Sequence, residues 1–547
     1  MDLNQKLAPC LMLQGTSSHV GKSVLATAFC RIFARMGYRV APFKSQNMAN
    51  NSYVTREGLE IGRAQAAQAE AAGVESSTSM NPILLKPSSD GTAQIVLNGK
   101  PVTEEGAWAY RENWVPKLWC HVQEALQRLR TQYDVVVIEG AGSPSEVNLK
   151  DRDIANMRVA MEASAHVILV GDIEKGGMLA SIVGTLALLP KKECDLITGI
   201  IVNKFRGDKS LLDPGLEFLE NKTHKPVLGV LPYIQEKLVE EEDSVALTEK
   251  KHTRNNCNQE GAAYPGHEVV VGVVHLPRIS NFTDFEPLER HPQVTLKYCS
   301  LDSELARGQI DCLIIPGTKA TINDYLAFVN SNLFRSIKSQ NLLSTLPILG
   351  ICGGYQMLGS VIEDPQGVEG APGRTNGLNL LPVTTAFHAH KSTEHIALRL
   401  SENKQHHALF SVINDTWLQG YEIHMGQVEV KTPDAVWLED SQGNAKGACS
   451  PDHRILGTYL HDIFSNQTFV EWFINWVQSI NGNRGNISEM GRLPGEPNLL
   501  VAGNQKSVSH EGRFQKDKLQ RYDKLADYVA CHVDIDRICQ QLGLDGQ

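Results

Sequence analysis

Two short motifs in this chain of 547 residues carry side chains whose types and spacing suit catalysis. The first, Gly15-Thr16-Ser17-Ser18-His19-Val20-Gly21-Lys22-Ser23, joins an apolar segment to an apolar helix-length segment. The amides of such a loop face an anion, and the N-terminus of the following helix adds positive potential. Lys22 is suited to neutralising phosphate charge and Ser23 to holding Mg²⁺. The motif therefore predicts ATP binding by Gly15, Thr16, Ser18, Gly21, Lys22 and Ser23, although its two glycines are one residue further apart than in the usual loop.

Polar residues follow three other expected strands, and ligands of open α/β sheets gather at the carboxyl ends of strands. Glu139 is placed to be a second Mg²⁺ ligand or to hold the metal's water, and the amide of Asn203 to bind the adenine edge. Asp172 ends the third strand. The alternative for all three is a polar residue that only caps a strand.

The second motif, Gly350-Ile351-Cys352-Gly353-Gly354, lies between an expected strand and an expected helix. Small flanking residues permit the sharp turn that exposes a nucleophile, and a helix N-terminus favours a thiolate. The amides of Gly353 and of Gly317, which ends another strand, are expected to form an oxyanion hole. A buried structural cysteine is the alternative, but Cys352 alone among the 11 cysteines has this context.

A nucleophilic thiol needs a base, and several histidines compete for that role. His461 ends an apolar segment, residues 456–461, that we expect to be a strand, and it is a modestly better candidate than His424. His388 and His390 are further candidates.

The elements that must position these motifs alternate in the way typical of a parallel sheet covered by helices, so the predicted fold class is α/β. Expected strands are residues 11–13, 38–42, 133–138, 166–170, 197–202 and 227–231, then 269–274, 312–315 and 347–351; expected helices are residues 22–36, 115–130 and 516–542. The predicted organisation is a first α/β domain at 1–235, a linker at 236–267, a second α/β domain at 268–480, a polar insertion at 481–513 and a terminal helix at 514–547.

Composition limits the possible partners. The formal net charge of −10 makes a broad nucleic-acid-binding face unexpected. No apolar run approaches the ~18 residues of a membrane helix, and the N-terminal residues do not resemble a secretion signal. The odd number of scattered cysteines fits reduced thiols better than disulfides. We therefore expect a cytoplasmic protein without membrane insertion.

The chain resembles the cobyric acid synthases, which are glutamine-dependent amidotransferases of cobalamin biosynthesis. The resemblance covers nearly the whole chain and rests on these motifs: Lys44-Ser45-Gln46-Asn47-Met48, Glu60-Ile61-Gly62-Arg63-Ala64-Gln65, Met80-Asn81-Pro82-Ile83-Leu84-Leu85-Lys86-Pro87, Glu139-Gly140-Ala141-Gly142, Asp153-Ile154-Ala155-Asn156-Met157, Gly171-Asp172-Ile173-Glu174-Lys175-Gly176-Gly177, Asn203-Lys204-Phe205-Arg206-Gly207-Asp208 and Gly420-Tyr421-Glu422-Ile423-His424-Met425-Gly426. It implies a P-loop domain like that of dethiobiotin synthetases, followed by a flavodoxin-like class I glutamine amidotransferase domain.

The family pattern assigns Cys352 as nucleophile and His461 as base. Many class I glutaminases carry His-x-Glu, in which the glutamate orients the imidazole, but the second residue after His461 here is Ile463. Asp462 is a poor substitute because neighbours on a strand face opposite ways. What orients His461 is left open.

The implied substrates are ATP with Mg²⁺, L-glutamine as nitrogen donor, and the corrinoid adenosylcobyrinic acid a,c-diamide, four of whose carboxylates become amides through acyl phosphates. A substrate with several carboxylates calls for cations, and the resemblance suggests the following contacts: Lys44, Gln46, Asn47, Arg63, Lys86 and Asp153, with Lys150 and Arg206 as further candidates. Each cation could equally be a surface charge.

Three other functions compete with this hypothesis. One is the sister enzyme cobyrinic acid a,c-diamide synthase, which amidates other carboxylates. Another is a deviant P-loop ATPase switch protein, although the lysine usual near the first glycine of that loop is missing from Gly15-Thr16-Ser17. A third is a pseudo-glutaminase, whose second domain only binds. A homo-oligomer is possible.

Overall fold

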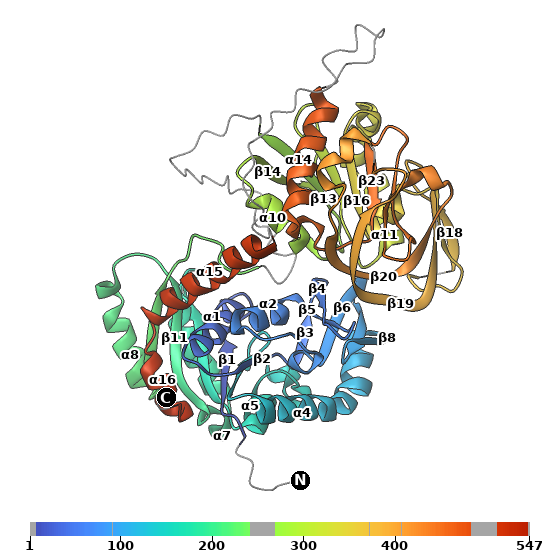
Figure 1. Ribbon diagram of the computed structural model, residues 1–547. Coiled ribbons are helices and arrows are strands. Elements are labelled where there is room, and N and C mark those ends of the chain that lie inside the picture. The colour runs from blue at the N-terminus through green and yellow to red at the C-terminus, as the bar shows by residue number, and fades with distance from the viewer. Residues whose placement is uncertain are drawn as a thin grey trace. The chain divides into compact units, whose positions relative to one another are not determined.

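The computed structural model describes residues 7–89, 91–240, 268–370, 372–405, 407–482 and 511–544. The chain divides into two compact units, one formed by Met1–Glu242 with Asp517–Gln547 and the other by Asp243–Lys516 (Figure 1). Most of the predicted linker at 236–267 and of the predicted insertion at 481–513 lies outside the described residues.

A parallel sheet of six strands forms the centre of the first unit, in the order β12-β11-β10-β1-β9-β2. These strands confirm all six that the sequence predicts for this region, and they are β1 (Cys10–Gly15), β2 (Val40–Phe43), β9 (Val135–Glu139), β10 (His166–Asp172), β11 (Ile197–Phe205) and β12 (Val227–Pro232). Successive residues of β1 enter two different apolar clusters, Cys10 and Met12 one, Leu11 and Leu13 the other. The sheet is therefore buried on both faces, which explains why its strands are continuous apolar runs.

Helices cover both faces of this sheet (Figure 1). They are α1 (Lys22–Arg35), α2 (Arg63–Ala72), α4 (Val115–Gln132), α5 (Met157–Ala163), α6 (Met178–Leu188) and α8 (Asp213–Thr223). The predicted helices at 22–36 and 115–130 correspond to α1 and α4.

Six short strands of the first unit were not expected from the sequence. A small sheet has the order β3-β6-β7-β8, and β4 pairs with β5. Their bounds are β3 (Gln46–Met48), β4 (Ser52–Val54), β5 (Glu60–Gly62), β6 (Ile83–Ser89), β7 (Thr92–Leu97) and β8 (Lys100–Gly106). None of the residues of β8 is buried, so this strand has no continuous apolar run to mark it.

The C-terminal segment contains two helices, so the prediction of one helix over 516–542 was wrong in its middle. α15 (Glu511–Ala530) ends before α16 (Ile535–Leu542) begins. Val533 pairs with Gly229 of β12, and the side chain of Asp534 accepts a hydrogen bond from the amide of Arg537 as the N-cap of α16. Both interactions require non-helical backbone between the helices.

A sheet of eleven strands dominates the second unit. Its parallel part has the order β14-β13-β15-β16-β23. The strands β13, β15 and β16, and β23 before His461, confirm predicted strands, whereas β14 was not predicted. An antiparallel extension through β22, β21 and β19 was not predicted. The strands are β13 (Val269–His275), β14 (Val294–Ser300), β15 (Cys312–Ile315), β16 (Ile348–Ile351), β17 (Val361–Asp364), β18 (Gly373–Asn376), β19 (Val383–Leu400), β20 (Leu418–Val430), β21 (Val436–Glu439), β22 (Ala445–Cys449) and β23 (Ile455–Thr458).

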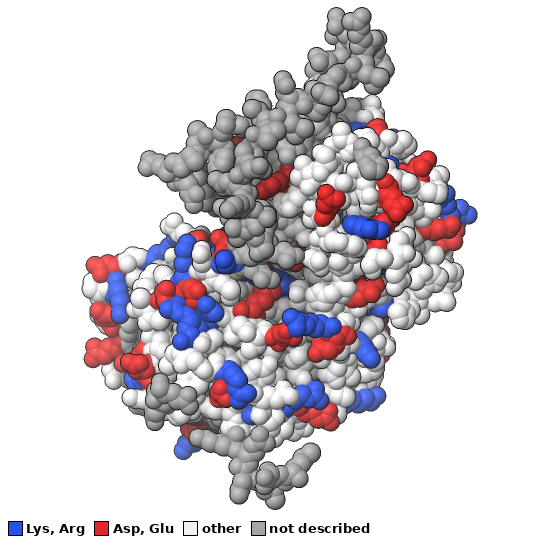
Figure 2. Space-filling model, viewed as in Figure 1, with Lys and Arg blue, Asp and Glu red and all other residues white. Residues whose placement is uncertain are grey.

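The helices of the second unit include α11 (Thr321–Val329), α12 (Asn332–Ser339), α13 (Gly353–Leu358) and α14 (Gln467–Gly482). Of the described residues, no helix is both long and apolar enough to cross a membrane. On the face shown in Figure 2, acidic and basic side chains alternate over short distances.

Candidate active sites

Cys352 lies in the sharp turn that the sequence predicts between β16 and α13. Its backbone has φ 50° and ψ −110°, a conformation that non-glycine residues rarely adopt. The turn is fixed because the amide of Cys352 donates to the carbonyl of Thr458, at 2.9 Å, and its carbonyl accepts from the amide of Gln356, at 3.1 Å. Strained backbone is typical of a nucleophile at such a turn, but Cys352 as a whole residue is only 6% exposed.

His461 lies beside this thiol, three residues after the end of β23. Its Nδ1 is 2.7 Å from Oδ2 of Asp284, and both side chains are buried. A carboxylate can only accept hydrogen bonds, so Nδ1 carries the proton and Nε2 is left for the thiol. The other carboxylate oxygen of Asp284 accepts from the amide of Asp462, at 3.0 Å. The arrangement is that of a thiol, an imidazole and an orienting carboxylate.

The electrostatics of this group favour a charged imidazole. Burial alone would lower the pKa of His461, but the Asp284 carboxylate and a hydrogen bond with Cys352 together raise that pKa to about 10. The Tyr421 ring stacks on the imidazole, with centroids 5.5 Å apart. An imidazolium beside a sulfur atom stabilises the thiolate, which is the nucleophilic form.

The sequence did not identify Asp284 as the group that orients His461, because the two residues are far apart along the chain. Asp284 is 177 residues away along the chain, in the short 3₁₀ helix Phe282–Phe285. A carboxylate between two phenylalanines, shortly after the carboxyl end of an apolar strand, was the available signal. Asp462 instead accepts a hydrogen bond from Ser465, so it is engaged in its own turn.

Gly317 and Gly353, the expected oxyanion-hole residues, both border the thiol. A Cβ atom added to Gly317 would lie 3.2 Å from Cε1 of His461 and 3.6 Å from Cβ of Cys352. A Cβ atom added to Gly353 would lie 3.1 Å from the amide nitrogen of Thr318. Gly317 and Gly353 therefore lie beside Cys352, and the segment that follows Gly317 packs closely against Gly353.

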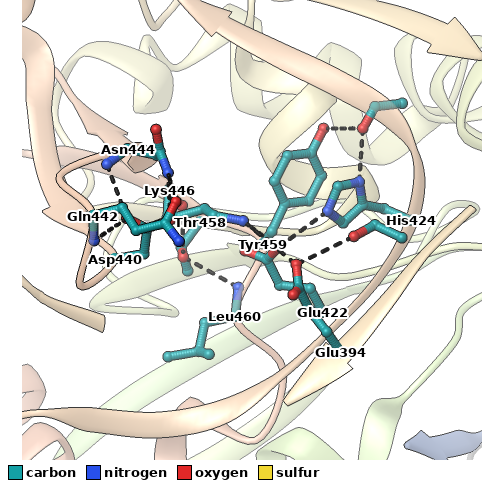
Figure 3. A network of polar contacts seen from close by, with 12 residues as sticks. Glu394, Glu422, His424, Asp440, Gln442, Asn444, Lys446, Thr458, Tyr459 and Leu460 are labelled. Carbon is teal, nitrogen blue, oxygen red and sulfur yellow. Dashed lines mark hydrogen bonds and ion pairs between the residues drawn. The ribbon is translucent and has the colours of Figure 1, made fainter. Parts of the chain in front are cut away.

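His424, the rival base, belongs to a separate polar network (Figure 3). Its Nδ1 lies 2.8 Å from the carbonyl oxygen of Gly426, and its Nε2 lies 3.4 Å from Oε2 of Glu422. Its ring stacks on Tyr459, with centroids 3.7 Å apart. Lys446 donates to the same Glu422 oxygen at 2.8 Å. With both ring nitrogens engaged there, His424 is a weaker candidate than His461. His388 and His390 lie on β19.

The predicted phosphate loop follows β1 and ends at the start of α1. Gly21 has φ 101°, which favours glycine, and a Cβ atom added to Gly15 would lie 2.8 Å from Nζ of Lys22. That Nζ donates to the carbonyls of Ser17 and Gly142, each at 3.0 Å. The lysine therefore lies across its own loop, where the phosphates of a nucleotide would bind.

Glu139 lies at the carboxyl end of β9 and is fully buried against this loop. Its Oε1 accepts from the hydroxyl of Ser23 at 2.8 Å and from the ammonium of Lys44 at 2.9 Å. Its Oε2 accepts from Nε2 of Gln68 at 2.7 Å. The structure thus brings the two predicted metal ligands, Ser23 and Glu139, into contact.

Asp172 at the end of β10 and Asn203 in β11 help to stabilise the loop. Nδ2 of Asn203 donates to the carbonyl of Val20 at 2.8 Å. Lys204 donates to the carbonyl of His19 and to Asp172, both at 2.8 Å. The Asn203 amide that we expected to bind adenine is therefore engaged with the loop itself.

Several predicted substrate contacts are engaged within the chain. Lys86 pairs with the buried Glu60 at 2.6 Å. Arg63 pairs with Glu70 at 3.1 Å and with Glu240 at 2.5 Å, and it lies over the ring of Tyr53.

The other predicted contacts also have partners. Gln46 accepts from the hydroxyl of Tyr110, and Asn47 donates to Gln65 at 2.9 Å. Asp153 accepts from the amides of Ala155, Asn156 and Arg158 at the start of α5. Lys150 pairs with Glu193, and Arg206 with Glu174. Lys44 is connected to the phosphate loop through Glu139, which also accepts a hydrogen bond from Ser23.

Comparison with known proteins defines the class. A CobQ/CobB/MinD/ParA nucleotide binding domain matches residues 11–245, and a CobB/CobQ-like glutamine amidotransferase domain matches residues 270–469. The two together define an ATP-dependent, glutamine-hydrolysing amide ligase.

The chain belongs to the cobyric acid synthase family. It is 44% identical over 532 residues to the cobyric acid synthase of Geobacillus sp. (strain WCH70), which covers 97% of each chain. It is 42% identical over 544 residues to that of Desulforamulus reducens, covering 98% of this chain and 99% of the relative. It is 45% identical over 471 residues to the cobyric acid synthase of Acaryochloris marina, covering 86% of this chain and 91% of the relative. The family resemblance seen in the sequence is thereby confirmed.

Proposed function

We propose that this enzyme converts side-chain carboxylates of adenosylcobyrinic acid a,c-diamide to amides, four in successive rounds, with ATP and glutamine as co-substrates. The observation that carries the proposal is the identity of 42–44% over nearly the full length of cobyric acid synthases, so that both units are included. Carboxylate and ammonia do not condense unaided because hydroxide is a poor leaving group. One unit must therefore activate the acid and the other must supply the nitrogen.

In the second unit, Cys352 attacks the side-chain amide of glutamine and forms a thioester, with release of ammonia. His461 gives its proton to the departing nitrogen and then takes one from the water that hydrolyses the thioester. Asp284 holds the imidazole in the required tautomer, and its distance of 2.7 Å from Nδ1 supports this role. The amides of Gly317 and Gly353 stabilise the oxyanion.

In the first unit, the loop amides and Lys22 hold the phosphates of ATP while its γ-phosphoryl group moves to a corrinoid carboxylate. Ammonia then displaces phosphate from the acyl phosphate. Lys44, which contacts Glu139 beside the loop, is the cation best placed to attract the reacting carboxylate.

Mg²⁺ fits the oxygen donors beside the loop, since it prefers hard oxygen ligands. The hydroxyl of Ser23 and the carboxylate of Glu139, 2.8 Å apart, would hold it. When bound, this ion neutralises charge on the transferring phosphoryl group.

The test is to incubate the full chain with ATP, Mg²⁺, glutamine and each candidate corrinoid acid, and to count the added amides by mass. We expect four amides on the a,c-diamide, with positions assigned by NMR. Amidation of the a and c carboxylates of cobyrinic acid itself would instead identify the sister activity and contradict the proposal.

A further inference from the structure

Gln68 is a fully buried glutamine on α2, and the established chemistry of phosphate loops gives it no role. Glutamine is mostly exposed in proteins, because burial of its amide must be matched by hydrogen bonds. α2 nevertheless buries Gln65 and Gln68, three residues apart and so on one face of the helix. Gln65 bonds to Asn47, whereas Gln68 contacts Glu139.

The orientation of the Gln68 amide follows from its contact with Glu139. The carboxylate can only accept, so the NH₂ group must face Oε2, at 2.7 Å. Ser23 and Lys44 already donate to the other carboxylate oxygen. With Gln68, both oxygens of Glu139 are held, and the plane of the carboxylate is fixed relative to Ser23.

The remaining oxygen of Gln68 is an acceptor that lacks a donor. Throughout the part of the chain that the structure describes, no protein group donates to Oε1 of Gln68, and the atom is buried. Buried acceptors without partners are rare in native structures. Its donor must therefore be a water or a ligand, and a Mg²⁺ ion at Ser23 and Glu139 would retain several waters that donate strongly.

We infer that Gln68 is a positioning residue of the metal site: its NH₂ group orients Glu139, and its Oε1 accepts a hydrogen bond from a metal-bound water. Partners of this kind hold metal ligands in place and raise metal affinity. The inference rests on the proposed function, because it assumes that the loop binds ATP together with a divalent cation.

The test compares Gln68→Met, which keeps the length and apolar stem of the side chain, with the wild-type full chain. A fluorescent ATP analogue is titrated with Mg²⁺ and with EDTA, and Mn²⁺ binding is followed by electron paramagnetic resonance. We expect nucleotide affinity in Mg²⁺ and Mn²⁺ affinity to fall about tenfold or more, with nucleotide affinity in EDTA unchanged. Gln65→Met, on the same face of α2 but bonded to Asn47, is the matched control and should retain the metal dependence.

Thermal unfolding in EDTA checks that the variants fold, and Gln68→Leu gives a second variant without either hydrogen bond. Unchanged Mn²⁺ affinity, or equal losses of nucleotide affinity with and without Mg²⁺, would overturn the inference and leave Oε1 with an ordinary buried water. A wild-type protein whose ATP affinity does not depend on Mg²⁺ would instead contradict the proposed function, and the inference with it.

Discussion

Asp284 keeps the imidazole of His461 in the glutaminase site protonated at neutral pH, because it raises the pKa of that group. A buried imidazole normally loses its proton easily, but the carboxylate beside it reverses this and raises the pKa of His461 to about 10. The imidazole therefore stays protonated throughout the neutral range. Asp284 also holds the amide of Asp462, so it fixes the backbone as well as the ring.

Asp284→Asn keeps the shape of this site and removes the charge. We expect glutamine hydrolysis to fall on the order of 100-fold, because the imidazole loses both its preferred tautomer and its stabilised cation. The rate at which iodoacetamide inactivates the enzyme should report the thiolate, and its dependence on pH should change because the pKa of His461 falls. An unchanged profile would show that Asp284 only supports the fold.

The same pair makes stability depend on pH. The pKa of His461 is raised from 6.5 to about 10, so its stabilisation is complete below about pH 6.5 and is lost as the pH rises toward 10. The difference in unfolding free energy between wild type and Asp284→Asn should be about 3 kcal/mol at pH 6 and should shrink at alkaline pH. Urea unfolding measures it, and a difference that grows with pH would contradict the assignment.

At the scale of elements, the turn between β16 and α13 depends on close backbone approach. A Cβ atom added to Gly354 would lie 1.8 Å from the carbonyl oxygen of Ile315 at the end of β15. Gly354→Ala must therefore displace α13 from the sheet, and we expect a loss of stability of about 3 kcal/mol together with lost glutamine hydrolysis. Gly184→Ala is the control because nothing lies within 4 Å of the added atom, and Gly184 is within helix α6.

The helix α15 is joined to the first unit through a buried charge cluster. Lys518 pairs with Glu240 at 2.7 Å and also with Glu70, and Arg63 holds the same two carboxylates. Burial would raise the pKa of Glu240, but Arg63 and Lys518 lower it well below its usual range.

Lys518→Met should destabilise the first unit by about 3 kcal/mol, because it leaves the buried carboxylate of Glu240 with one cation fewer. The pKa of Glu240 is depressed, so the stabilisation is present above about pH 4.5 and is lost as the pH falls below it. Lys524→Met is the matched control, since Lys524 lies on the same helix as Lys518 but makes an exposed ion pair, with Glu236. This substitution should change the free energy of unfolding by less than about 0.5 kcal/mol. Equal losses of stability for Lys518→Met and Lys524→Met in urea unfolding would contradict the role of the cluster.

Over the whole molecule, the sequence predicted those features that depend on residues close together along the chain. The parallel strands of the first unit are apolar runs because both faces of their sheet are buried, and the two motif turns follow strand ends, so these features were visible in the sequence. Contacts between distant segments were not visible. Asp284 meets His461 across 177 residues, and Gln68 meets Glu139 across 71. Arg63 and Lys86 looked like substrate contacts because their buried acidic partners, Glu240 and Glu60, could not be assigned from spacing.

We propose that one chain contains two separable activities, release of ammonia by Cys352 and activation of an acid beside Lys22. The most direct measurement is amide formation on the corrinoid a,c-diamide by the Cys352→Ala enzyme, supplied with either glutamine or an ammonium salt. We expect no product with glutamine and full amidation with ammonium, whereas Lys22→Ala should form no amide from either source. Undiminished glutamine-dependent product from Cys352→Ala would contradict this proposal.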